Sequence, residues 1–242
     1  MPVGVTATSR EVHDLHMLVL WICVVIGAGV YGAMIAAIVK FRKSKGAVAS
    51  KFTHNATIEV IWTVIPAAIL VAMAVPAAET LIRMEDTRDS ELTIKVTGYQ
   101  WRWHYDYIDD GVGFYSTLDR ESNAARRTGS GVDPTTVDNY LLKVDNDVVV
   151  PVNKKVRLLI TAGDVLHAWW MPAFAVKKDA VPGFINEAWF NADTVGTYRG
   201  QCAELCGMDH GFMPIVVRVV SQEDYDAWLN TQRARVSALT LQ

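Results

Sequence analysis

The sequence predicts an α+β membrane protein, in which a two-helix transmembrane hairpin precedes a β-barrel or sandwich. Two observations support this fold class. Residues 17–39 and residues 60–78 contain no charged side chain, and both stretches are strongly apolar. After Arg83 the pattern changes to short runs rich in Val, Ile, Leu, Thr and Tyr, separated by Gly, Pro, Asn and Asp. We therefore expect residues 1–81 to form an N-terminal segment and the hairpin, and residues 82–242 to form an outer domain.

The two apolar stretches are long enough to cross a bilayer. They contain 23 and 19 residues, and a helix crosses a hydrocarbon core of about 30 Å with about 20 residues. We place the membrane helices at about residues 17–39 and 60–79. Pro66 and Pro76 fall in the second helix, which membrane helices tolerate because neighbouring groups or water bind the freed carbonyls. The alternative, two buried helices of a soluble core, fits this length less well.

The charges between the helices predict their orientation. No acidic residue lies between Lys40 and Ile58, and the basic residues between the helices are Lys40, Arg42, Lys43, Lys45 and Lys51. The positive-inside rule places this loop in the cytoplasm, so both termini and the outer domain lie outside. Because the basic cluster follows the first apolar run, we expect this run to be a retained anchor and not a cleaved signal peptide.

The outer domain is expected to consist of short strands, with a helix at its end. A stretch rich in glycine at residues 109–138 predicts a long excursion or mobile loop. Residues 222–238 predict a short helix in which Tyr225, Trp228 and Leu229 share a face. The expected strands are residues 91–98, 141–144, 156–161, 196–201 and 214–220.

The outer domain is acidic. It contains 17 Lys and Arg against 22 Asp and Glu, a net charge of −5. This balance argues against a nucleic-acid partner and is compatible with a surface on which a basic protein docks. Ordinary solubilising charge is the alternative interpretation.

The most informative stretch is residues 202–213, which read CAELCGMDHGFM. Cys202, Cys206, His210 and Met213 supply two thiols, one imidazole and one thioether within this loop. Thiolate and thioether are soft ligands and imidazole is borderline, so the mixture favours copper over magnesium, calcium or manganese. A tetrahedral zinc site would have little use for the methionine.

A pair of copper ions would use these donors more fully than one. A blue-copper site takes two His, one Cys and a weak Met, which leaves one cysteine without a role. Two metals bridged by both thiolates require a second histidine from elsewhere. His13 and His16 start the first membrane helix, His54 lies in the cytoplasmic loop, and His104 lies in an aromatic strand. We choose His167, which follows a predicted strand.

Simpler interpretations exist for each of these residues. Cys202 and Cys206 could form a disulfide in an oxidising compartment, His210 could be a surface residue, and Met213 could belong to the core. Cys23 lies inside the first membrane helix without a partner and is expected to serve packing. The joint occurrence of the four donors at this spacing favours the metal site.

Taken together, these features resemble subunit II of cytochrome c oxidase. The matching features are two membrane helices, an aromatic strand, the run Val-Leu-His-Ala-Trp at His167, and Cys-Ala-Glu-Leu-Cys-Gly-x-x-His-x-x-Met. The resemblance covers nearly the whole chain. It implies a cupredoxin-like antiparallel β-barrel or sandwich that holds a dinuclear copper-A centre.

The resemblance also implies the ligand set. Cys202 and Cys206 would bridge the two copper ions, and His167 and His210 would each bind one. Weak axial ligands would be Met213 and the backbone carbonyl of Glu204. The side chain of Glu204 would reach a magnesium or manganese ion at the border with the catalytic subunit.

Residues 99–107 alternate between aromatic and polar side chains. We expect a single strand with five rings on one face, which most often means a packed face or an interfacial aromatic belt. Trp101 is the exception, because it resembles the tryptophan through which electrons enter in this family.

Further roles are implied for four acidic residues. Asp109, Asp145 and Asp164 occupy positions resembling the acidic surface on which the donor docks. Glu59 would be the entrance of a proton pathway that leads into the catalytic subunit. The alternative for Glu59 is a carboxylate stabilised by a helix N-terminus.

The implied function is electron transfer. The chain would accept electrons from reduced cytochrome c and pass them to a catalytic subunit I. There, haems and a third copper would reduce O2 to water, coupled to proton pumping. The sequence has no Cys-x-x-Cys-His, so the electron donor is expected to be a separate protein. The other expected partners are further oxidase subunits and the lipid bilayer, and no nucleic acid.

The expected location is the bacterial inner membrane, with the copper domain on the periplasmic side; the mitochondrial inner membrane is less favoured. Three alternative functions share part of the pattern. A quinol oxidase subunit has the same architecture without the copper pair. A membrane-anchored copper chaperone or sensor would hold an exchangeable metal. A copper-A subunit of a nitric oxide reductase would differ only in its catalytic partner.

Overall fold

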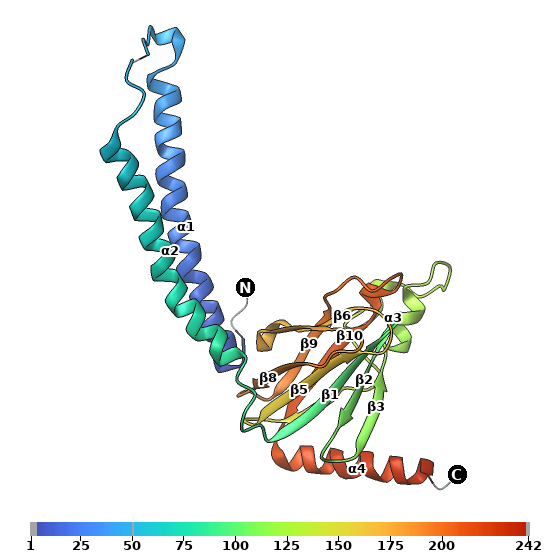
Figure 1. The fold of residues 1–242 in the computed structure, drawn as a ribbon. Helices are drawn as coiled ribbons and strands as arrows, with labels where there is room; N and C mark the ends of the chain where they lie inside the picture. The colour runs from blue at the N-terminus through green and yellow to red at the C-terminus, as the bar shows by residue number, and fades with distance from the viewer. Residues whose placement is uncertain (1–3, 50, 241–242) are drawn as a thin grey trace. The chain divides into compact units, whose positions relative to one another are not determined.

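The chain forms two units in a computed structural model that describes residues 4–49 and 51–240. One unit consists of residues 11–81, and the other is a β domain formed by residues 82–240 together with residues 4–10 (Figure 1). The N-terminal segment therefore packs with the β domain: Val5 donates a backbone hydrogen bond to Ala173, and Arg10 pairs with Asp193 at 2.6 Å. The helices are α1 Ala7–Lys40, η1 Lys43–Lys45, α2 Ala56–Met84, α3 Arg120–Ala125, η2 Pro134–Thr136, η3 Pro172–Phe174, η4 His210–Phe212 and α4 Gln222–Thr240.

The helices α1 and α2 are long and apolar enough to cross a membrane, as the sequence predicts. Their apolar side chains lie on the surface of the unit, where lipid can cover them. Pro66 and Pro76 both lie inside α2. At the start of α2, the Asn55 side chain accepts hydrogen bonds from two backbone N–H groups, and Glu59 accepts one from the Asn55 N–H. This reciprocal capping explains where the helix begins.

The β domain consists of two five-stranded sheets, with the strand orders β3-β2-β1-β5-β8 and β4-β10-β9-β6-β7. This confirms the predicted fold class. Most pairs are antiparallel, but each sheet also contains one parallel pair, β1 with β5 and β4 with β10. The strands are β1 Leu92–Tyr99, β2 Arg102–Tyr107, β3 Val112–Ser116, β4 Val148–Pro151, β5 Lys155–Ala162, β6 His167–Met171, β7 Val176–Ala180, β8 Asn186–Asn191, β9 Gly196–Cys202 and β10 Pro214–Val220.

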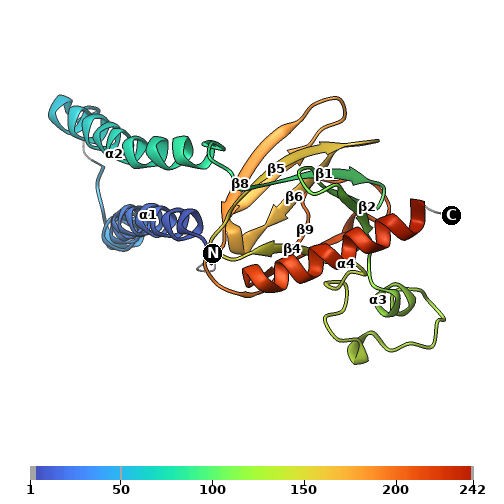
Figure 2. The same cartoon turned by 90° about the horizontal axis from the view of Figure 1, so that it is seen from below.

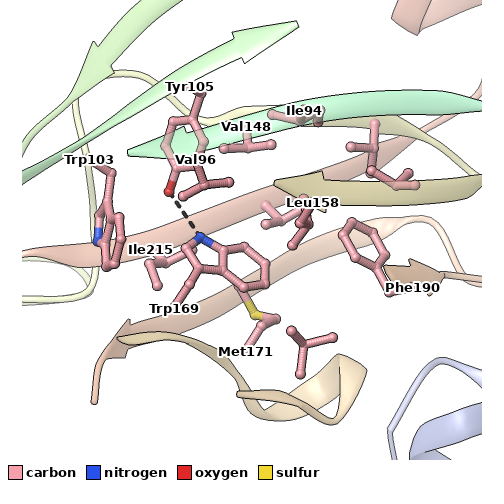
Figure 3. Close-up of a cluster of buried hydrophobic side chains, with 14 of the residues drawn as sticks. Ile94, Val96, Trp103, Tyr105, Val148, Leu158, Trp169, Met171, Phe190 and Ile215 are labelled. Carbon is pink, nitrogen blue, oxygen red and sulfur yellow. Dashed lines mark hydrogen bonds between the residues drawn. The ribbon is translucent and has the colours of Figure 1, made fainter. Parts of the chain in front are cut away.

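The core lies between the two sheets. Every second residue of β5 is buried, which is the pattern of a strand with one face in the core. Figure 3 shows Tyr105 of β2 opposite Trp169 of β6, and the Trp169 indole N–H donates a 3.3 Å hydrogen bond to the Tyr105 hydroxyl. Ile94 and Ile215 pack in the same cluster. A fully buried side chain of this size contributes about 1.5–3 kcal/mol, so the contact between the sheets is the main source of the domain's stability.

The expected strands at residues 91–98, 156–161, 196–201 and 214–220 are confirmed as β1, β5, β9 and β10. The expected strand at residues 141–144 is wrong. Asn139 and Leu141 have φ angles of 50° and 62°, and such left-handed residues interrupt an extended strand. Only Val144 forms an isolated bridge, with Leu118.

The segment at residues 109–138 is not a featureless loop, because it contains β3 and α3. The C-terminal helix is confirmed as α4, which lies across one end of the two sheets (Figures 1 and 2). Tyr225 and Leu229 on this helix are buried, and Trp228 packs against the core beside them.

The expected single aromatic strand is two strands. Tyr99 ends β1 and pairs with Arg102 at the start of β2, so Gln100 and Trp101 form the turn of a hairpin. The expected face of five rings is therefore wrong. Three of these rings do share a buried face of β2, and they belong to Trp103, Tyr105 and Tyr107.

Candidate metal centre

Three neighbouring strands position the donor residues. The strands β6 and β10 both pair antiparallel with β9, so the start of each lies beside the end of β9. His167 is the first residue of β6, Cys202 is the last residue of β9, and Met213 directly precedes β10. The loop between β9 and β10 therefore folds back at the end of the sheet where His167 lies.

All of the predicted donors converge at this end of the sheet. Cys202 Sγ lies 3.9 Å from Cys206 Sγ and 3.9 Å from His167 Nδ1. Cys206 Sγ lies 3.5 Å from His210 Nδ1 and 3.6 Å from the Met213 sulfur. The backbone carbonyl of Glu204 lies 3.4 Å from Cys202 Sγ.

The site has the chemistry of a soft-metal centre. The ligand atoms of His167, Cys202 and Cys206 lie within 4.8 Å of one another, and all three residues are buried. Both cysteines are free thiols, and their sulfur separation of 3.9 Å is far longer than a disulfide bond of about 2.05 Å. Two thiols, two imidazoles and a thioether around one space fit copper well. The disulfide alternative is therefore wrong for this structure.

The surroundings change the acidity of both thiols. Burial alone would raise the pKa of Cys202, but hydrogen bonds with His167 and with the backbone of Glu204 lower the pKa to about 7. Burial raises the pKa of Cys206, and the neighbouring negative charge of Cys202 raises it further. The thiolate of Cys202 thus forms more readily than that of Cys206, and a bound cation would stabilise both.

Asp164 fixes the orientation of the His167 ring. Its carboxylate lies 2.9 Å from His167 Nε2 and accepts backbone hydrogen bonds from Gln100 and Val165 at 2.7 and 2.6 Å. The other ring nitrogen of His167 then faces Cys202. Orientation of a ligating histidine by a carboxylate is typical of metal sites. The resemblance implies only a docking role for Asp164, and the sequence does not predict this contact with His167.

Two further residues that shape the site were also not predicted. A Cβ atom at Gly98 would lie 2.8 Å from a ring carbon of His167, so only glycine leaves room for the imidazole there. The signal in the sequence was a glycine inside a predicted strand, which often marks a close approach. The indole N–H of Trp103 donates a 3.2 Å hydrogen bond to the Met213 carbonyl, and the Trp103 ring meets the His167 ring edge-on at 5.9 Å between ring centroids.

The structure brings Trp101 to the centre. Its indole N–H donates to the Cys206 carbonyl at 3.2 Å, and the Gln100 side chain donates to the same carbonyl at 2.8 Å. The half-buried Trp101 ring therefore lies against the loop that carries both cysteines.

The other three predicted residues are Asp145, Asp109 and Glu59. Asp145 is exposed and bonds to Thr117, next to the end of β3 that pairs with Trp103. Asp109 follows β2 at its other end, away from Trp103, and the structure does not bring it to the centre. Glu59 lies at the start of α2, where it caps the helix.

A membrane hairpin that carries a two-sheet β domain with a buried site of soft ligands defines a class of metal-binding membrane subunits. The chain matches the family description "Cytochrome C oxidase subunit II, periplasmic domain" over residues 92–220, and "Cytochrome C oxidase subunit II, transmembrane domain" over residues 1–79. The chain belongs to the cytochrome c oxidase subunit II family, and it is therefore a subunit of an oxidoreductase complex.

Individual relatives agree with this assignment. A probable cytochrome c oxidase subunit 2 of Rickettsia felis is 46% identical over 221 residues, which cover 91% of this chain and 67% of that protein. Cytochrome c oxidase subunit 2 of Cereibacter sphaeroides is 38% identical over 233 residues, covering 93% and 77%. The crystal structure of the periplasmic domain of subunit II of cytochrome oxidase from Bradyrhizobium japonicum is similar with a TM-score of 0.53 and 43% identity. The aligned region covers 62% of this chain and 98% of the chain in that structure.

Proposed function

We propose that this chain accepts electrons from reduced cytochrome c at a pair of copper ions and passes them to a haem-copper catalytic subunit. One observation carries the proposal: two free thiols lie 3.9 Å apart, each within 4 Å of a different histidine Nδ1. This arrangement uses both cysteines, which a single blue-copper site would not do.

The donors divide into strong and weak ligands. Cys202 and Cys206 would bridge the two copper ions, and His167 and His210 would each bind one. The Met213 sulfur and the Glu204 carbonyl would be the weak ligands. When bound, the copper pair supplies a one-electron redox centre.

The protein holds the donor residues in fixed positions and keeps water away from them. Asp164 holds the His167 ring, and Trp103 holds the carbonyl of Met213. His167 is 0% exposed and Met213 is 1% exposed, so water has little access to these two donors. Ligands that are held in place in this way rearrange little when the charge of the centre changes, which favours fast electron transfer.

The surface beside the centre suits a transient partner. Trp101 would be the residue through which electrons enter, since its ring lies against the cysteine loop. On the loop itself, Leu205 and Met208 are 78% and 84% exposed, and exposed apolar side chains of this size favour a protein contact. Asp145 and Asp164 would attract a basic cytochrome c. Asp109 lies at the other end of β2, so it would contribute less to docking at this face.

The remaining roles depend on partner subunits. The Glu204 side chain would bind a magnesium or manganese ion shared with the catalytic subunit, which would also hold the haems and the third copper. Glu59 would open a proton pathway into that subunit. The expected location is the bacterial inner membrane, with both termini and the β domain on the periplasmic side, because the basic loop between the helices favours the cytoplasm.

The main competing function is a copper chaperone or sensor. Such a protein needs an exposed metal that exchanges, but Cys202 and Cys206 are only 5% and 3% exposed. A nitric oxide reductase subunit would share this site, and the haems of the co-purified catalytic subunit would distinguish it.

Metal counting on the purified full chain tests the proposal. We expect two tightly held copper ions per chain and an electron paramagnetic resonance spectrum of one electron shared by both. The matched variants Cys202→Ser and Cys206→Ser should each lose this signal, whereas Cys23→Ser should keep it. One labile copper per chain would indicate a chaperone. A disulfide between Cys202 and Cys206 in folded, metal-free protein would overturn the proposal.

A further inference from the structure

The segment between β3 and β4, residues 117–147, is an ordered insertion in the β domain. Its two ends are joined, since Thr117 and Asp145 exchange backbone and side-chain hydrogen bonds, and Asp119 N–H donates to the Lys143 carbonyl. The helix α3 is anchored by Ser122 and Ala125, which are both buried. Figure 1 shows α3 at the end of the domain opposite to α4. The insertion is therefore an ordered part of the domain, at the end away from α4.

Arg126, directly after α3, is the point of contact with the metal loop. Its two terminal nitrogens each donate a 2.9 Å hydrogen bond to a different carboxylate oxygen of Asp209. The same guanidinium lies 4.3 Å above the centroid of the Phe212 ring, and its Nε donates to the Asn123 side chain at 2.8 Å. The side chains of Arg126 and Asp209 are only 21% and 22% exposed.

These contacts bear directly on the donors. Asp209 precedes His210, and Phe212 precedes Met213. A bidentate pair fixes both distance and orientation, unlike a single contact of a lysine. The guanidinium therefore restrains the residues next to two of the donors at once.

A second contact lies at the other end of the metal loop. The Gln201 side chain donates to the Leu141 carbonyl at 3.4 Å, and the Arg199 side chain donates to the Leu142 carbonyl. Gln201 and Arg199 belong to β9, which ends at Cys202. The insertion thus touches both the metal loop itself and the strand that leads into it.

We propose that the insertion at residues 117–147 is a clamp on the metal loop, and that Arg126 is the positioning residue that holds His210 and Met213 in place through Asp209 and Phe212. The clamp acts on the folded loop before any metal arrives. The clamp proposal rests on the proposed function in one respect, namely that His210 and Met213 are copper ligands.

Thiol labelling of the metal-free full chain tests the clamp without copper. All variants would carry Cys23→Ser, so that only Cys202 and Cys206 react. We expect Arg126→Gln to raise the labelling rate about tenfold, equivalent to about 1.4 kcal/mol of loop opening. The matched control is Arg127→Gln, because Arg127 is the next residue and is exposed; its rate should stay at that of the parent. Equal rates in the two variants would overturn the proposal.

The partner residue provides a second test. Asp209→Asn should raise the labelling rate as Arg126→Gln does, and the double variant should label no faster than either single variant. Additive effects would overturn the clamp. Arg126→Lys keeps the positive charge but cannot form the bidentate pair, so its labelling rate should lie between those of the parent and Arg126→Gln. This variant also tests the clamp if Arg126→Gln does not fold.

Copper binding gives an independent readout. With copper added, Arg126→Gln should still take up metal, but it should lose the metal faster to a chelator and show altered hyperfine splitting in its electron paramagnetic resonance spectrum. An unchanged spectrum and release rate would contradict a positioning role. If the parent chain binds no copper, the proposed function fails, whereas the labelling experiments still decide the clamp.

Discussion

Asp164 orients the imidazole ring of His167 toward the two cysteines. The Asp164 carboxylate lies 2.9 Å from His167 Nε2, and Nδ1 of the same ring lies 3.9 Å from Cys202 Sγ. A ring held at one nitrogen presents the other in a defined direction. The carboxylate is in turn held by two backbone N–H groups. This chain of contacts makes Asp164 part of the metal site, in addition to any part in docking.

Replacing Asp164 should weaken metal binding. Loss of such an orienting partner typically costs about 10–100-fold in metal affinity, so we expect Asp164→Ala to lower copper affinity by at least about tenfold. Chelator competition on the purified full chain measures this effect. Asp179→Ala, which removes an exposed carboxylate from β7, is the control. If both variants bind copper as the parent does, the orienting role is wrong.

Adding one methyl group at position 98 should disturb the centre. In Gly98→Ala the new Cβ would lie 2.8 Å from the His167 ring, and overpacking of this kind costs about 1–3 kcal/mol. We expect a lower melting temperature and weaker copper binding. In Gly211→Ala the new Cβ meets nothing within 4 Å, so this variant should match the parent in both measurements. Equal melting temperatures for the two variants would contradict the packing argument.

The stability of the β domain should depend on pH through Asp147. Burial raises the pKa of Asp147, and the charge of Arg218 opposes this only in part. A carboxyl group with a raised pKa in the folded state binds its proton more tightly there than in the unfolded chain. Its contribution to stability is therefore complete below the unfolded pKa of about 3.9, and it is lost as the pH rises through the folded pKa.

Asp147→Asn removes the carboxyl group whose ionisation destabilises the folded domain. We therefore expect this variant to have a higher melting temperature than the parent at pH about 7, and we expect the difference to disappear as the pH falls toward about 4. Thermal unfolding across this range tests the sign. The control is Asp138→Asn, because Asp138 is exposed and lines the same surface groove as Asp147; this variant should show no such trend. An advantage of Asp147→Asn that does not change with pH would show that the proton is not its cause.

Removing the indole at position 101 should slow electron transfer from cytochrome c without removing the copper. Trp101→Phe loses the hydrogen bond to the Cys206 carbonyl, and a single hydrogen bond is worth only about 1 kcal/mol, so the fold should persist. Stopped-flow reduction of the intact oxidase measures the rate, and metal analysis measures the copper. Trp170→Phe, at a partly exposed tryptophan of β6, is the control. Equal rates for the two variants would show that electrons do not enter through Trp101.

Some features of the protein follow from local sequence alone. The length of an uncharged apolar run sets whether it can cross a bilayer, so both membrane helices could be predicted from their composition. The donors from Cys202 to Met213 lie within one short loop, so their convergence needs no knowledge of distant contacts. The spacing of Tyr225, Trp228 and Leu229 in α4 could also be predicted, because it reflects one buried face of a helix.

Other predictions failed where a few backbone angles decide the outcome. Residues 141–144 have the composition of a strand, but the left-handed φ angles of Asn139 and Leu141 produce a turn. The aromatic run was divided because the chain reverses at Gln100 and Trp101. Alternation of side chains predicts a face only for as long as the strand continues.

The tertiary structure decided every contact between residues far apart in the chain. His167 and Cys202 lie 35 positions apart and meet because β6 and β9 are neighbours. Arg126 and Asp209 lie 83 positions apart, and the sequence of residues 109–138 predicts only a long excursion or mobile loop. The physical reason is that ion pairs, close packing at Gly98 and the orientation of His167 by Asp164 depend on which strands lie side by side, whereas composition determines only which segments can enter the membrane or the core.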